Sequence, residues 1–187
     1  MSNYKTLYIT NRKSWREWLE KNFQKEKEVW LIYPKKASGK KRIPYNDAVE
    51  EALCFGWIDS TIKTYDEECS MQRFTPRNPK SKFSQPNKER LRWLAEHDML
   101  HPSVREKADE ILAVEFVFPD DLIEIIKSDP EAWKNYRNFS EAYKRIRIAY
   151  IDQARPHPEE YEKRLNNFLK KTRENKLIAY GGIEKHF

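Results

Sequence analysis

An apolar helical stripe that ends at a glycine and leads straight into two strand-like segments constrains this fold most. A helix is predicted to begin at Pro44, with an inner face formed by Ala48, Val49, Ala52, Leu53 and Phe55. Gly56 follows where a helix ends in a left-handed residue. Trp57 to about Lys63 and Cys69 to Phe74 then predict an antiparallel hairpin that turns through the acidic Asp66-Glu67-Glu68.

The segments on either side of this unit have equally regular patterns. A first helix is predicted from the spacing of Trp15, Trp18, Leu19 and Phe23. Ser14 with Glu17 has the spacing of a capping box, although Thr10 or Asn11 could begin that helix instead. Val29–Tyr33 predicts a buried strand. Asn46 or Asp47 is expected to cap the helix after Pro44.

The second half has only helical patterns. The predicted helices are about 89–97, 102–112, 120–127, one that Asp129 caps with Pro130 at its first position, one from Ser140 to Tyr150, and one across 161–169. We therefore expect an α+β fold. It has a small antiparallel or mixed sheet of about three strands packed by helices, followed by a helical C-terminal module. The expected domains are 1–116 and 117–187.

Composition excludes several classes of protein. The longest apolar run, Val29–Tyr33, is far too short to cross a bilayer, so no membrane insertion is expected. The presence of only 4 glycines argues against a nucleotide-binding protein of the glycine-loop type. The four histidines lack metal-ligand spacing, so no metal or other cofactor is predicted. Two cysteines without an export signal favour reduced thiols and a cytoplasmic location.

The net charge of +6 arises entirely in the first half of the chain. Residues 35–42 carry five positive charges and no negative one, and residues 73–92 carry seven positive and one negative. Residues 43–72, between them, carry one positive and seven negative. Either these blocks neutralise one another as solvated faces, or the basic segments 35–42 and 73–92 bind nucleic acid or another anion.

A candidate site lies on the hairpin and the segment after it. Asp59 should share a strand face with Trp57, and Arg73 on the returning strand is its expected partner. Trp57 could be a pocket wall or a core residue, and the Asp59–Arg73 pair could be structural or ligand-binding.

The stretch from Thr75 to Lys88 has no periodicity and contains three prolines, which is typical of a binding loop or a mobile loop. Ser84 or Asn87 could instead cap the next helix. The complete set of predicted ligand-binding residues is Trp57, Asp59, Ser60, Lys63, Arg73, Phe74, Arg77, Ser81, Ser84 and Asn87, with no catalytic and no metal-binding residue assigned.

The block from Ala52 to Ser60 and the motif from Arg73 to Arg77 resemble the YdeI/OmpD-associated family, also called bacteriocin-protection proteins. The helical stretch from Ala132 through the Arg164 region is similar to that family's C-terminal module. The chain departs from the family in the stretch from Glu96 to Leu100. Relatives often carry a glycine beside the methionine that corresponds to Met99, and this chain has none there. The resemblance implies a bacterial cytoplasmic α+β protein and a link to protection against stress, but no reaction.

Three functions remain open from the sequence. The first is a stress-protection protein that binds a small anionic ligand or an acidic peptide. The second is a nucleic-acid-binding protein that uses the two basic segments. The third is a small hydrolase or transferase with Asp59 as the base, which would need Asp59 in a cleft beside a donor.

Overall fold

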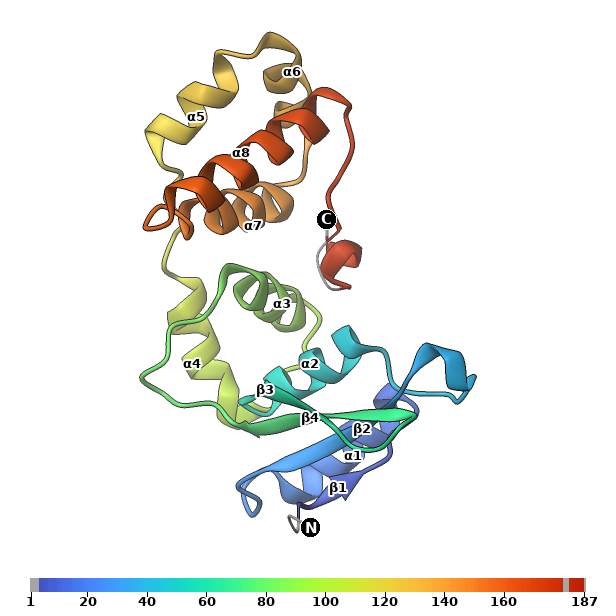
Figure 1. Ribbon diagram of the computed structural model, residues 1–187. Helices are drawn as coiled ribbons and strands as arrows, with labels where there is room; N and C mark the ends of the chain where they lie inside the picture. Colours follow the sequence, from blue (N-terminus) through green and yellow to red (C-terminus); the bar gives the residue numbers. More distant parts are fainter. Residues whose placement is uncertain (1–3, 180–181, 187) are drawn as a thin grey trace. The chain divides into compact units, whose positions relative to one another are not determined.

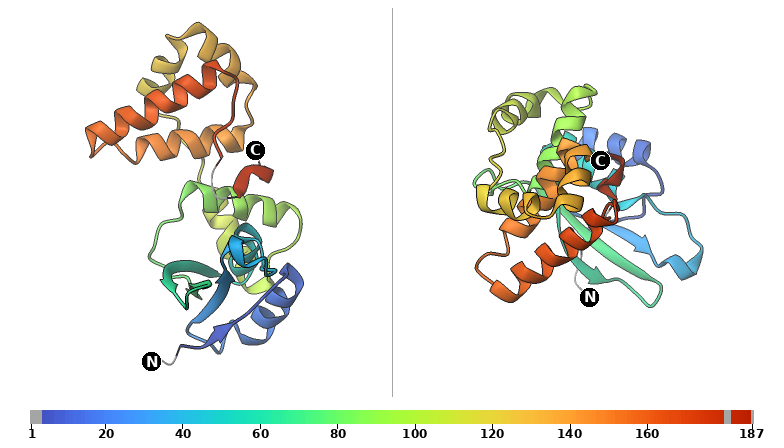
Figure 2. Two further views of the ribbon diagram at one scale, coloured as in Figure 1. Left: turned by 45° about the vertical axis from the view of Figure 1, so that its right-hand side comes forward. Right: turned by 90° about the horizontal axis from the view of Figure 1, so that it is seen from above.

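The computed structural model describes residues 4–179 and 182–186 (Figures 1 and 2). The chain divides into two compact units. An α+β unit comprises the residues up to Lys82 together with Leu94–Glu110, and a helical unit comprises Phe83–Trp93 and the residues from Ile111 onward. The predicted boundary after residue 116 lies between helices α4 and α5.

The α+β unit is built on a four-stranded mixed sheet (Figure 1). Its strands are β1 (Thr6–Leu7), β2 (Val29–Pro34), β3 (Trp57–Thr64) and β4 (Cys69–Pro76), in the order β1-β2-β4-β3. β1 pairs with β2 in parallel, and the other pairs are antiparallel. The α+β class and the predicted hairpin are confirmed, with one strand more than expected.

Two helices cover the sheet face that carries Trp57 and Phe74. They are α1 (Arg12–Asn22) and α2 (Tyr45–Cys54). Trp15 of α1 is fully buried, lies edge-on to Phe74 and donates its indole N–H to the Ala48 carbonyl at 3.0 Å. This bond fastens α1 to α2 over the sheet, so the indole contributes both apolar contact and a satisfied polar group.

The helix caps partly differ from expectation. Asn11 caps α1 by accepting the Ser14 N–H at 2.9 Å, one of the alternatives open from the sequence. The predicted cap of α2 was wrong: the helix already begins at Tyr45, so Asn46 lies inside it, and Pro44 precedes it without a side-chain bond.

Gly56 makes the predicted helix-to-strand junction. Its φ of +72° is left-handed, a conformation that a Cβ would strain. The Gly56 carbonyl accepts the Arg77 N–H at 2.8 Å, which ties the start of β3 to the end of β4. Helix α4 (Pro102–Leu112) packs here, with Val104 beside the glycine. Within the stretch Glu96–Leu100, Asp98 also takes a left-handed φ, of +52°.

The helical unit has its own core. Its complete helices are α5 (Asp120–Lys127), α6 (Pro130–Asn138), α7 (Glu141–Asp152), α8 (Pro158–Arg173) and the short η2 (Ile183–His186). Leu122, Tyr136, Ile148 and Phe168 are among its buried side chains. Helix α3 (Gln85–Glu96) begins in this unit, where the buried carboxylate of Glu89 receives both arms of Arg145 at 2.7 and 2.8 Å.

Capping of α6 provides a first testable expectation. Asp129 accepts the Ala132 N–H at 3.1 Å and pairs with Arg173. The Ala132 N–H, followed by Arg173, lowers the pKa of Asp129 below its ordinary 3.8. Its contribution is therefore present above about pH 4 and lost as the pH falls through the lowered folded value. Asp129→Ala should destabilise the helical unit by about 1 kcal/mol at neutral pH.

Hydrogen exchange of the α6 amides measures this effect, with the exposed Glu162→Ala as the control. The stability that Asp129→Ala removes from the helical unit should become smaller as the pH is lowered. A loss that stays constant down to pH 2 would show that the carboxylate does not cap the helix.

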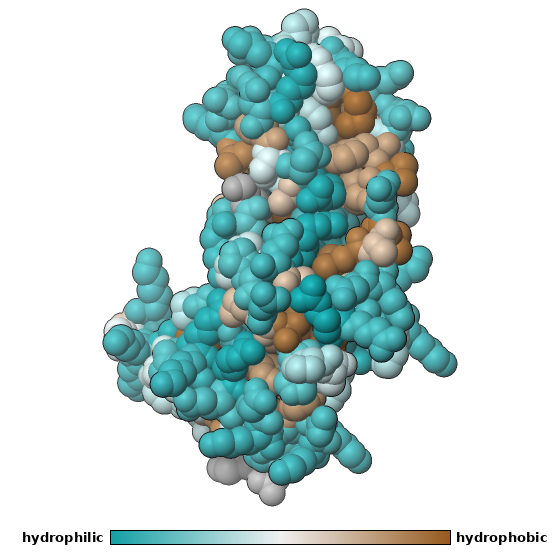
Figure 3. Space-filling view, turned by 180° about the vertical axis from the view of Figure 1, so that it is seen from behind, coloured by the Kyte–Doolittle hydropathy of each residue, from teal (hydrophilic) through white to brown (hydrophobic). Residues whose placement is uncertain are grey.

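The surface is mainly hydrophilic, and the face in Figure 3 carries a few groups of apolar side chains among hydrophilic ones. Exposed large apolar side chains include Tyr45, Ile62 and Val117. Within the described part of the chain, no helix has the length and apolar character that a membrane span requires.

Candidate functional site

The predicted pair of Asp59 and Arg73 does not form. Asp59 lies opposite Phe74 in the β3–β4 register, so these two side chains share one face of the sheet. Arg73 precedes Phe74 and therefore points to the other face. It binds Glu28 instead, with its Nε 2.9 Å from a Glu28 oxygen. The expectation that Asp59 pairs with Arg73 was therefore wrong, whereas Asp59 does share a strand face with Trp57.

Asp59 is held by neutral donors. One of its oxygens accepts the Tyr45 hydroxyl at 2.8 Å and the Gln72 amide at 3.1 Å. Tyr33 lies close by, and its pKa is raised by burial and then by Tyr45 and Asp59. Gln72 also donates to the carbonyl of Ser60, which is exposed in a β-bulge. The result is a half-buried carboxylate in a polar, aromatic environment.

Arg73 and Lys63 belong to a second cluster. Bonding from Arg73, and next from Trp30, lowers the pKa of Glu28 below its ordinary value. Lys63 donates to the Tyr4 hydroxyl at 2.6 Å, and its ammonium lies over the rings of Tyr4 and Trp30 at 4.7 and 5.2 Å. Each of these two cations already has partners within the protein.

Trp57 and Phe74 are core residues. Trp57 is 1% exposed and donates its indole N–H to the Phe23 carbonyl at 3.0 Å, and Phe74 is fully buried. Of the two interpretations of Trp57, the structure therefore supports the core one.

The predicted binding loop is shorter than expected, because β4 extends to Pro76 and α3 begins at Gln85. Arg77 donates to the Ser81 carbonyl at 2.6 Å, and burial lowers its pKa. Asn87 lies inside α3 and accepts from Arg90 at 3.0 Å, so it does not cap that helix. Ser84 is exposed just before α3. Ser84 and Asn87 belong to the helical unit, whereas Arg77 and Ser81 belong to the α+β unit.

Several cations of the two basic segments contact acceptors of the protein. In the first segment Lys40 pairs with Glu68 at 2.7 Å, and Lys35 and Arg42 bind backbone carbonyls. In the second, Arg73 pairs with Glu28 and Arg92 with Glu89. These contacts favour the interpretation of neutralised faces, and nucleic-acid binding stays a prediction.

Two fully buried carboxylates were missed from the sequence. Glu50 and Glu51 of α2 are 0% exposed and are held by Arg12 and Arg16, which lie one turn apart on α1. A signal was present, because these two glutamates interrupt the stripe of buried apolar residues that the sequence predicts for this helix. Such carboxylates need cations nearby, since an unpaired buried charge is costly.

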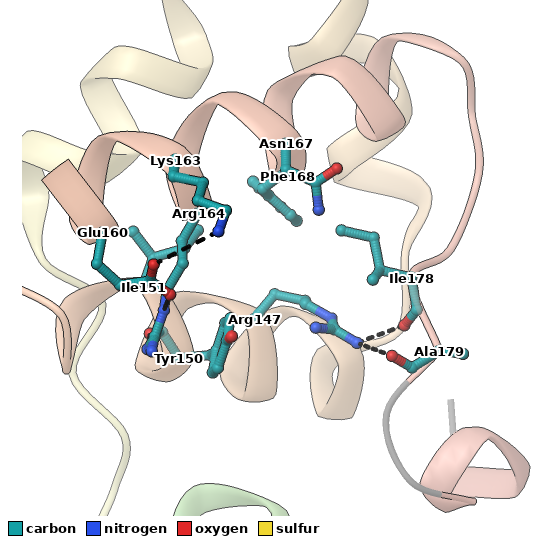
Figure 4. A pocket seen from close by; sticks show the side chains of 10 residues that line it. All are labelled: Arg147, Tyr150, Ile151, Glu160, Lys163, Arg164, Asn167, Phe168, Ile178 and Ala179. Carbon is teal, nitrogen blue, oxygen red and sulfur yellow. Dashed lines mark hydrogen bonds and ion pairs between the residues drawn. The ribbon is translucent and has the colours of Figure 1, made fainter.

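A cavity of about 300 Å³ in the helical unit was also missed (Figure 4). It is lined by Arg147, Tyr150 and Ile151 of α7, by Glu160, Lys163, Arg164, Asn167 and Phe168 of α8, and by Ile178 and Ala179. Three of these side chains are cations and one is a carboxylate. Arg147 follows Ile146 and precedes Ile148 in a buried stretch, which is the only hint in the sequence.

The cations of this cavity are held in place. Arg147 is 4% exposed and donates to the carbonyls of Ile178 and Ala179 (Figure 4). Arg164 bonds to Glu160 and to the Tyr150 carbonyl at 2.8 and 2.7 Å, and stacks 3.8 Å from the Tyr150 ring centroid. The bond from Arg164 lowers the pKa of Glu160.

Lys163 differs from these two arginines, because its side chain is 80% exposed. Its ammonium lies 3.9 Å from Glu160. The cavity thus combines an apolar floor with an excess of positive charge.

Among the described residues, no group of three or more His, Cys, Asp or Glu is placed to hold a metal ion.

Fold and sites together define an α+β protein with a separate helical unit that contains a cation-lined cavity. A family described as "Domain of unknown function (DUF8412)" matches residues 7–107, more than half of the chain, and the chain belongs to that family. A second family, described as "Bacteriocin-protection, YdeI or OmpD-Associated", matches residues 115–175, which include α5 to α8. The resemblance to that family is confirmed over residues 115–175 of the helical unit, whereas the block from Ala52 to Ser60 lies within the first match. No curated protein and no solved structure matches the chain.

Proposed function

We propose that this protein binds a small anionic ligand in the cavity of its helical unit, as part of a bacteriocin-protection or stress-protection role in the cytoplasm. The observation that carries the proposal is the excess of cations around a cavity with an apolar floor. Guanidinium and ammonium groups in such a setting bind carboxylates and phosphates. The match to the bacteriocin-protection family over residues 115–175, which include the α7 and α8 residues that line the cavity, supports the role.

The size of the cavity favours a small molecule over a peptide. About 300 Å³ is at the lower end of ligand pockets, enough for a small carboxylate or phosphate compound. Both cysteines, Cys54 and Cys69, are free thiols, which supports a reducing compartment. Burial raises the pKa of Cys54 to about 12, so that this thiol is not a nucleophile at neutral pH.

The test is a titration of the full chain with inorganic phosphate and with citrate at low salt, followed by NMR of the α7 and α8 amides. Lys163→Glu reverses the most exposed charge of the cavity and should weaken binding about tenfold or more, because like charges now face each other. Lys134→Glu is the matched control: its side chain is 67% exposed on α6, outside the cavity lining, and should change the affinity less than twofold.

Binding should also weaken as salt is added, since exposed charges are screened. If Lys163→Glu and Lys134→Glu weakened anion binding equally, the affinity would depend on the net charge of the protein and not on the cavity. Absence of shifts around the cavity at millimolar anion would overturn the proposal. Binding of an acidic peptide but of neither small anion would reject the small-ligand class.

A further inference from the structure

β3 is an open edge strand of the sheet. The order β1-β2-β4-β3 places it at one end, and in the described part of the chain it pairs with β4 alone. Every residue from Ser60 to Thr64 is exposed. An open edge presents backbone donors and acceptors to which an extended peptide can add as a further strand.

Asp59 lies on this edge strand without a cation. Its carboxylate bonds to the Tyr45 hydroxyl and the Gln72 amide, and no described Lys, Arg or His lies within ion-pair distance. Other half-buried or buried carboxylates of this unit, such as Glu28 and Glu51, are paired with arginines. Among the described residues, the Asp59 carboxylate is therefore held by neutral donors and has no cationic partner.

A buried hydroxyl beside Asp59 gives an independent indication of a ligand. Tyr33 is 6% exposed, and its hydroxyl is buried with no hydrogen-bond partner among the described residues. Tyr33 lies on the sheet face that Asp59 shares, and the Arg42 guanidinium lies 5.8 Å from its ring centroid. An orphaned buried polar atom is uncommon, and an N–H from a bound cation would satisfy it.

Neighbouring side chains fit the stem of a long cation. Tyr45 and Ile62 are 42% and 66% exposed. Ile62 lies opposite Gln72, on the face that Asp59 shares. Aromatic and apolar surface beside a carboxylate suits the methylene stem and charged head of Lys or Arg.

We propose that β3 is a docking edge for an extended basic peptide segment of a partner protein, which adds to the sheet as a fifth strand and places a Lys or Arg against Asp59. A residue directly opposite Asp59 on the added strand would project to the same face, within reach of the carboxylate. The backbone supplies sequence-independent affinity, and Asp59 with Tyr33 and Tyr45 selects the cation. This site is separate from the cavity of the helical unit and does not depend on it.

The probe is the capped peptide acetyl-Thr-Val-Lys-Val-Thr-amide, titrated into the full chain and followed by the amide NMR signals of β3. The expected result is shifts confined to β3 and its neighbours. Asp59→Asn should weaken binding about tenfold to a hundredfold, the range expected for the loss of a charge-assisted bond. Glu67→Gln is the matched control, because it removes an exposed carboxylate from the adjoining turn with the same change in net charge. It should change the affinity less than twofold.

Two peptide controls keep the test valid even if Asp59→Asn disturbs the sheet. The first replaces Lys by Glu. The second keeps Lys but carries N-methyl groups on all its backbone amides, which removes strand pairing. Both should bind the unaltered protein at least about tenfold more weakly.

Equal binding of all three peptides, or equal weakening by Asp59→Asn and Glu67→Gln, would overturn the proposal. So would β3 signals that shift with protein concentration alone, since a second copy of the chain would then be the occupant of the edge.

Discussion

Arg12→Met is expected to destabilise the α+β unit by about 3–5 kcal/mol, the largest loss from any single charge removal in this unit. Arg12 binds Glu51 through its Nε and Glu50 through a terminal nitrogen at 2.8 Å, and both carboxylates are fully buried. Without Arg12, Glu51 keeps only Arg16 and Glu50 loses its bond to the cation. A buried carboxylate that loses its cation costs far more than the pair contributed while intact.

The measurement is native-state hydrogen exchange of the α1 and α2 amides in urea, which reports on this unit alone. Lys13→Met is the matched control, because Lys13 is the next residue of α1 and its side chain is 87% exposed. It should change the free energy of unfolding by no more than about 0.5 kcal/mol. Arg12→Lys keeps the positive charge but loses the planar guanidinium that binds both carboxylates. Its loss in the free energy of unfolding should lie between those of Arg12→Met and Lys13→Met. If Arg12→Met and Lys13→Met lowered the free energy of unfolding by the same amount, Glu50 and Glu51 would not depend on Arg12 for their stability.

Trp57→Ala is expected to cost the same unit about 3–5 kcal/mol, because it empties a fully packed site. The indole lies edge-on to Trp18 at 6.0 Å, and its N–H satisfies the Phe23 carbonyl at the end of α1. Trp57→Phe should cost less, since it keeps a ring and leaves only that carbonyl without its donor. The free energy of unfolding, measured on the β4 amides, decides between the two roles considered for Trp57.

Ile62→Ala is the control on the same strand, because Ile62 is 66% exposed and should contribute about 0.5 kcal/mol or less. If Trp57→Ala were as mild as Ile62→Ala, the indole would be a solvent-facing wall of a binding site. In that case the core assignment would fail.

The parts of the fold that depend on neighbouring residues were predictable. The helix before Gly56, the left-handed glycine and a hairpin of Trp57 to about Lys63 with Cys69 to Phe74 follow from short-range patterns. All are present in the structure, where the two strands extend to Thr64 and Pro76. β1 was missed because two residues, Thr6 and Leu7, carry no periodicity and become a strand only by pairing with β2. The N-cap residues were also uncertain, because several polar residues near the start of a helix can each form the capping hydrogen bond.

The candidate site depended on long-range register, and there the sequence was insufficient. Arg73 and Phe74 are adjacent, but only Phe74 faces Asp59, so a shift of one residue changes every partner. The pairing register of β3 with β4 also shifts between Asp59 and Ile62, and the alternation of residues in the sequence does not reveal this shift. The partner of Arg73, Glu28, lies 45 residues away along the chain on the segment leading into β2. Pairing at such a separation is decided by the sheet order, which remained open from the sequence.

The bond between Glu89 and Arg145 has a practical consequence for dissecting this protein into fragments. Any cut made between α3 and α7 leaves one of these groups on each piece, and the piece containing Glu89 then carries an inward-facing acid that has lost its bidentate counterion. Expression trials of the N-terminal portion alone should therefore include Glu89→Gln, and poor solubility of the unmodified fragment would not by itself mean that the portion cannot fold.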